Sequence, residues 1–64
     1  MATQEQIRIV ISLLSENAQK NIDKARGWEA DTRYPNFSAR QVGYFYGKAF
    51  SELEAIKDLQ GRQG

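Results

Sequence analysis

The residue types that carry most catalytic chemistry are missing from this sequence, which contains no histidine and no cysteine. The usual general base, the best nucleophile and the commonest metal ligands are therefore absent. Glu52, Glu54 and Asp58 supply carboxylates, but they fall near the expected polar face of a helix and indicate a solvated surface. We predict a protein that is not an enzyme, with no catalytic residue, no cofactor and no metal site.

The chemistry that remains is recognition by basic and aromatic side chains. Residues 20–48 hold six basic and three acidic residues, a net charge of +3, together with most of the aromatic residues. Trp, Tyr and Arg are enriched in protein-binding hot spots, and basic residues beside aromatic ones also bind nucleic acid. Because the charge is modest, protein binding is favoured over nucleic acid; the third interpretation is that the aromatic rings only close the end of a helical bundle. The candidate partner-binding residues are Trp28, Arg33, Tyr34, Arg40, Tyr44 and Lys48.

Helical periodicity organises the first half of the chain. Thr3 and Gln6 have the spacing of a capping box, which predicts a helix start at about residue 4. An apolar seam with alternating spacings of four and three residues follows: Ile7, Ile11, Leu14, Ala18, Asn21, Ala25 and Trp28. The helix spans 4–26 if Gly27 caps it, or 4–31 if it continues through Gly27. The β-branched run at about 7–13 leaves open a strand in a small α+β fold.

A second helix is predicted at about 39–60, after a connector that extends to residue 37. Ser38 is the expected N-cap, Gln41 completes a capping box, and Phe37 with Val42 forms a hydrophobic staple. The expected core face contains Val42, Phe45 or Tyr46, Ala49, Leu53, Ile56 and Leu59. Gly61 ends the helix and residues 61–64 form a frayed tail.

Two features predict contact with a further helix. Ile9, Val10 and Leu13 form an apolar surplus that one partner helix cannot cover, unless the second helix curls over part of it. Gly43 and Gly47 lie in a stripe of small residues, where glycine costs roughly 0.5–1 kcal/mol and therefore needs a reason such as close helix packing or a deformation for a ligand. These five residues are the candidate self-association set.

A chain of 64 residues makes one domain, here residues 1–64, with a thin core. We predict an all-α, antiparallel two-helix hairpin that dimerises into a four-helix bundle. No secretory signal or membrane-spanning run is evident, so we expect a cytoplasmic location and no membrane partner. The predicted function is binding of another protein, as an inhibitor, adaptor or assembly factor of the kind carried by phages or mobile elements. The alternative is a nucleic-acid-binding regulator that uses the basic, aromatic bend of the hairpin.

Overall fold

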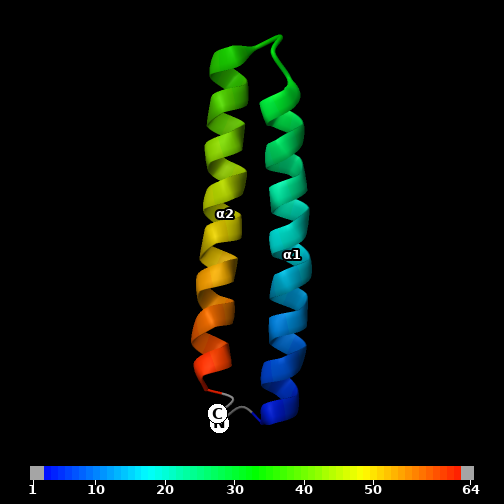
Figure 1. The fold of residues 1–64 in the computed structure, drawn as a ribbon, viewed down its shortest axis with the longest axis vertical. Helices are drawn as coiled ribbons and strands as arrows, with labels where there is room; N and C mark the ends of the chain where they lie inside the picture. Colours follow the sequence, from blue (N-terminus) through cyan, green and yellow to red (C-terminus); the bar gives the residue numbers. More distant parts are fainter. Residues whose placement is uncertain (1–2, 63–64) are drawn as a thin grey trace.

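The computed structural model describes residues 3–62, which form an antiparallel hairpin of two helices (Figure 1). Helix α1 spans Gln4–Ala30 and α2 spans Pro35–Gly61. The hairpin measures 47 × 15 × 14 Å. We call the end that holds the connector 31–34 the tip. The all-α hairpin is confirmed. The alternative strand at about 7–13 is wrong, because α1 covers this segment and no strand occurs within residues 3–62.

Helix α1 begins as predicted and ends at the later of the two predicted positions. Gln6 N donates to Thr3 Oγ1 at 3.1 Å and Thr3 N donates to Gln6 Oε1 at 2.9 Å, so the capping box is present. The helix continues through Gly27, and Asp31 is the C-cap. Gly27 therefore does not cap it. Continuation costs about 1 kcal/mol at glycine, but it keeps Trp28 on the inner side of the helix, where its ring meets Phe37.

Helix α2 begins four residues earlier than predicted. Pro35 is its first residue and Tyr34 its N-cap, with no side-chain capping hydrogen bond. Proline suits this position, because its fixed φ matches the helix and its missing N–H would have no partner there. The predicted N-cap Ser38 lies instead inside the helix and is buried. The capping box with Gln41 and the staple of Phe37 with Val42 are therefore wrong, because both need Ser38 outside the helix.

The most buried positions of the seam between the two helices are mainly small residues. The α1 seam follows the predicted positions, each buried or half-buried. Within residues 3–62, three of the five buried hydrophobic residues are alanines, namely Ala18, Ala25 and Ala49, and none of the larger side chains is fully buried. The complete α2 seam keeps the same alternating spacing: Ser38, Val42, Phe45, Ala49, Glu52, Ile56 and Leu59. Short side chains let the helices approach closely, but they also bury little apolar area.

A polar pair interrupts the seam halfway along the hairpin. Asn21 is 8% exposed, and its Nδ2 donates to Glu52 Oε1 at 2.6 Å. The sequence predicted Leu53 in the core and Glu52 on the solvated surface. The structure reverses them, because Glu52 is half-buried in the seam and Leu53 is 49% exposed. Of the two predicted alternatives for the core face, Phe45 lies in the seam and Tyr46 does not. A single buried polar pair of this kind favours one helix register over its neighbours.

The predicted tail at 61–64 falls partly outside the described residues. Gly61 is the last residue of α2 and Arg62 its C-cap, with Arg62 N donating to Leu59 O at 3.0 Å. Residues 63 and 64 lie outside the described range. Neither helix within residues 3–62 is both long enough and apolar enough to cross a membrane.

Candidate partner-binding tip

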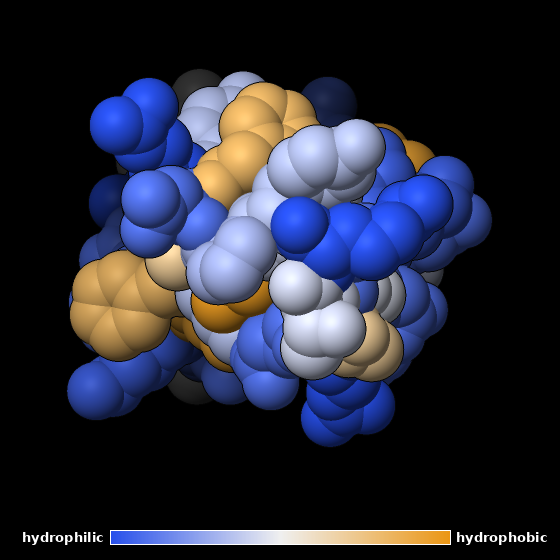
Figure 2. Space-filling view, turned by 90° about the horizontal axis from the view of Figure 1, so that it is seen from above, coloured by the Kyte–Doolittle hydropathy of each residue, from blue (hydrophilic) through white to orange (hydrophobic). Residues whose placement is uncertain are grey.

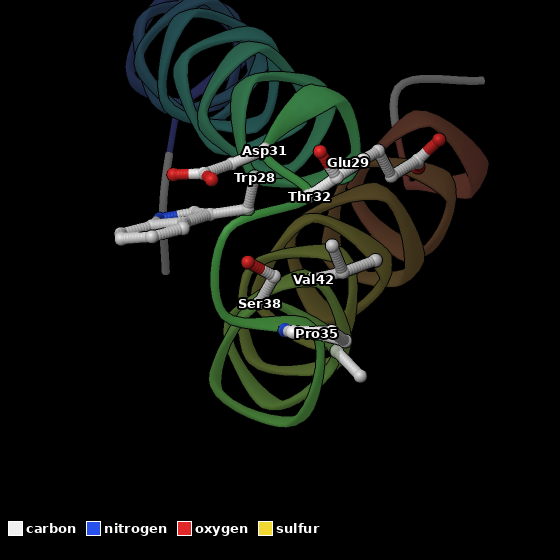
Figure 3. A pocket seen from close by; sticks show the side chains of 8 residues that line it. Trp28, Glu29, Asp31, Thr32, Pro35, Ser38 and Val42 are labelled. Carbon is white, nitrogen blue, oxygen red and sulfur yellow. The ribbon is translucent and has the colours of Figure 1, made fainter.

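A pocket opens at the tip between the end of α1 and the start of α2. The walls come from both helices and the connector: Trp28, Glu29, Asp31, Thr32, Pro35, Ser38, Ala39 and Val42. Figure 3 shows the Trp28 ring and the Glu29 side chain on opposite sides of the pocket, with Ser38 between them. The lining is mostly apolar, with the carboxylates of Glu29 and Asp31 at the α1 end.

Ser38 has a side chain that the hairpin leaves without a partner. The residue is 5% exposed, and its Oγ is buried with no hydrogen bond. Its backbone N–H bonds normally to Tyr34 O at 2.8 Å, so only the hydroxyl lacks a partner. Figure 3 shows this hydroxyl pointing toward the end of α1. An unpaired buried hydroxyl costs about 1–3 kcal/mol, so it lowers the stability of the hairpin.

Aromatic rings surround the pocket on the outside of the tip. The Trp28 and Phe37 rings meet edge to face, with centroids 5.3 Å apart and an interplanar angle of 79°. Phe37 is 51% exposed and Tyr34 is 64% exposed. The guanidinium of Arg33 lies over the Tyr34 ring, 6.0 Å from its centroid. The tip therefore presents large, ordered aromatic surface to solvent.

The connector is held by an ion pair between Asp31 and Arg33. Arg33 donates from Nη2 to Asp31 Oδ2 at 2.9 Å and from Nε to Oδ1 at 3.1 Å, and its backbone N–H donates to Oδ1 at 3.0 Å. These side-chain and backbone hydrogen bonds from Arg33 lower the pKa of Asp31 from 3.8 to about 2. A bidentate pair also fixes the guanidinium plane. The charge of Arg33 at the tip is thus largely matched by Asp31.

The structure divides the predicted partner-binding residues between two places. Trp28, Arg33 and Tyr34 gather at the tip. Arg40, Tyr44 and Lys48 are exposed and spaced four residues apart along α2, so they follow one face of this helix. The Lys48 ammonium lies 5.2 Å from the centroid of the Tyr44 ring. No ion pair involving Arg40 occurs within residues 3–62.

Several tip residues were not predicted as part of a site, among them Ser38, Phe37 and Asp31. Ser38 was assigned to the helix cap and Phe37 to a staple. The seam pattern identifies Ser38. Its alternating spacing of four and three residues, extended backward from Ala49, Phe45 and Val42, reaches Ser38. Asp31 carries no such signal, since its role depends on the connector conformation.

The predicted self-association residues lie on two sides of the hairpin. Ile9, Val10 and Leu13 are 51%, 42% and 56% exposed, so α2 does not cover them. A Cβ added at Gly43 or Gly47 meets nothing within 4 Å, so α1 does not pack against these glycines either. Val10 precedes a seam residue of α1 and Ile22 follows one, so the two flank the seam on opposite sides.

A second hollow lies on the Ile22 side, midway along the hairpin. It is lined by Ile22, Arg26, Tyr46, Gly47, Ala49, Phe50 and Leu53. Its wall is mostly apolar, and Phe50 is 64% exposed. Seen from the tip, hydrophobic side chains reach the outside of the molecule on more than one side (Figure 2). Gly47 thus belongs to a surface different from that of Ile9, Val10 and Leu13.

No family model, curated protein or solved structure matches this chain. Within residues 3–62, no group of three or more acidic side chains has the geometry of a metal site.

Proposed function

We propose that this protein is a binding module that recognises another protein through its tip and acts as a self-associating helical hairpin. The observation that carries this proposal is the apolar pocket at the tip, walled by Trp28 and bordered by the exposed rings of Phe37 and Tyr34. A partner side chain that fills this pocket removes its apolar walls from water, and that burial supplies binding free energy.

The pocket chemistry indicates the kind of side chain that fits. Trp28, Pro35, Ala39 and Val42 supply apolar walls. The expected ligand is therefore a partner side chain with a large apolar surface.

The surroundings of the pocket fit a protein interface. Trp28, Phe37 and Tyr34 provide aromatic area, and Arg33 is held in one orientation by Asp31. Trp, Tyr and Arg are the residue types most enriched in hot spots, and preorganised side chains lose little entropy on binding. A module of this kind would act as an inhibitor, adaptor or assembly factor.

Nucleic-acid binding is less well supported by the placement of charge. Arg33 is paired with Asp31, which leaves Arg40 and Lys48, on either side of Tyr44, as the two remaining cations of the predicted site. Phosphate recognition needs several unpaired cations along one track. A gel-shift assay at about 50 mM salt, the condition most permissive for phosphate contacts, tests this alternative, and a complex that weakens in Arg33→Ala would favour it over protein recognition.

The tip proposal is tested by affinity capture from the source cells followed by mass spectrometry. Thr32→Trp obstructs the pocket from the exposed connector without changing the seam. Asn17→Trp adds the same bulk at an exposed α1 position away from the tip, and is the matched control. We expect a protein that is retained by the wild type and by Asn17→Trp, and lost with Thr32→Trp. With the purified partner, Thr32→Trp should raise Kd at least tenfold, and equal binding of both variants would refute the tip as the site.

A further inference from the structure

Helix α2 carries a second apolar row beside its seam. Each member of this row directly follows a residue of the α2 seam. The members are Ala39, Gly43, Tyr46, Phe50 and Leu53. The alternating spacing of four and three residues is that of a helix-packing seam. We call this set the outer row. Phe50 and Leu53 are 64% and 49% exposed and Tyr46 is 38% exposed, so the hairpin leaves much of this row open to solvent.

We infer that α2 of a second copy of this chain packs antiparallel along the outer row, so that two hairpins form a four-helix bundle. This inference describes how the self-association in the proposed function takes place, and it depends on that self-association being correct. The incoming helix would fill the hollow bounded by Ile22, Arg26 and the outer row.

Size complementarity sets the register of this contact. In an antiparallel pair, each large residue of the row should face a small or aromatic one of the other copy. The layers match when Leu53 lies over Gly43 and Tyr46 lies beside Phe50 of the second copy. Gly43 has open space where a Cβ would be, and therefore leaves room for the Leu53 side chain.

Charge complementarity supports the same register. Arg40 and Glu54 lie one residue beyond Ala39 and Leu53 and border the outer row on its solvent side. Neither makes an ion pair within residues 3–62. In the antiparallel register, Arg40 of each copy lies near Glu54 of the other, which gives two symmetric ion pairs. Gly47 of each copy then lies near the symmetry axis, between these pairs.

The dimensions also fit a dimer. The symmetry axis of this register passes near residue 48, which is the middle of α2 (Pro35–Gly61), so the two hairpins overlap along their full length. The outer row extends over residues 39–53, roughly 21 Å of a hairpin that is 47 Å long. Because the helices are antiparallel, the two tips lie at opposite ends of the dimer and remain accessible.

The primary test compares two aromatic residues of α2 that are similarly exposed. Phe50→Glu places a charge in the outer row, and Tyr44→Glu places one at a 58% exposed position outside it. By sedimentation equilibrium, we expect a dimer for the wild type and for Tyr44→Glu. Phe50→Glu should weaken dimerisation at least 100-fold, since each interface contains two copies of this hot-spot residue. Circular dichroism should show that both variants remain helical.

A charge exchange tests direction and register. Arg40→Glu should weaken the dimer roughly tenfold, as should Glu54→Arg, because each creates two like-charge pairs. The double variant Arg40→Glu/Glu54→Arg should recover the wild-type dissociation constant. In a parallel dimer these residues would face their own copies, and the exchange would restore nothing.

Two outcomes would overturn the inference, and they are distinguishable. If Leu13→Asp dissociates the dimer and Phe50→Glu does not, the hairpin self-associates through the α1 surface of Ile9, Val10 and Leu13 instead. If the wild type is monomeric at about 100 μM, both this inference and the self-association in the proposed function fail. Recognition by the tip is tested separately and is affected by neither result.

Discussion

The two apolar rows of α2 differ in a way that a lone hairpin does not explain. The inner row is the α2 seam that faces α1, and its large apolar residues Val42, Phe45, Ile56 and Leu59 are buried or half-buried. The outer row also contains large apolar residues, Tyr46, Phe50 and Leu53, but these are exposed. Large apolar side chains thus occupy both rows, including the one that the hairpin leaves open. This distribution indicates that α2 has two packing faces, of which α1 uses one.

The two rows also differ in their contribution to the stability of the hairpin. A small core rarely contributes more than about 3–5 kcal/mol, and this one is built largely from alanine around a polar pair. Each Phe or Leu side chain that moves from water into an interface contributes about 1.5–3 kcal/mol. Covering the outer row would therefore add free energy comparable to that of the hairpin core itself.

The largest expected effect separates the two rows directly. Ala49→Asp buries an unpaired carboxylate in the seam and should destabilise the fold by about 3–5 kcal/mol, enough to unfold the hairpin. Phe50→Asp places the same charge in the outer row and should keep the helices. Thermal unfolding followed by circular dichroism at several protein concentrations measures both. The wild-type midpoint should rise with concentration and that of Phe50→Asp should not. If Ala49→Asp and Phe50→Asp lost equal amounts of helix, that result would contradict the distinction between the two rows.

The polar pair of the inner row gives the next largest effect. Glu52→Leu leaves the buried Asn21 amide without its partner and should cost about 1–3 kcal/mol. The double variant Asn21→Leu/Glu52→Leu removes both polar groups and should recover most of that loss. Urea unfolding measures the free energy of each variant. If the single variant is as stable as the wild type, the hydrogen bond contributes no stability and serves no structural role.

At the tip end of the inner row, a substitution should stabilise the protein. Ser38→Ala removes a buried hydroxyl that has no partner and improves helix propensity, so urea unfolding should show a gain of about 1 kcal/mol. A loss of stability would mean that the hydroxyl is already satisfied in the free protein.

The smallest effect concerns pH and does not involve either row. The pKa of Asp31 is lowered in the folded state to about 2 from 3.8. A lowered pKa means that the stabilisation is complete above pH 3.8 and is lost as the pH falls toward 2. Carboxyl-carbon NMR should place the Asp31 midpoint near 2 in the wild type. In Arg33→Ala the midpoint should return toward 3.8, and an unchanged midpoint would exclude Arg33 as the cause.

Local patterns were sufficient for most of the fold. The capping box of Thr3 and Gln6 needs only residues three apart, and the α1 seam repeats over four turns and more, so both were predicted correctly. Trp28, Arg33 and Tyr34 were predicted to lie together because a hairpin places its bend at one end. The prediction failed where two local signals competed. Ser38 has every feature of an N-cap, yet Pro35 is an equally good first residue for a helix.

The sequence by itself determined that the chain forms two antiparallel helices, where α1 begins, and which α1 residues form the seam, because helical periodicity and end capping act over a few residues. Only the tertiary structure decided where α2 begins and which of its two rows faces α1. That choice depends on the opposite helix: Asn21 selects Glu52, and the small α1 seam residues select Ala49. Once these contacts fix the register, Leu53 and Phe50 must face outward and the side chain of Ser38 must be buried.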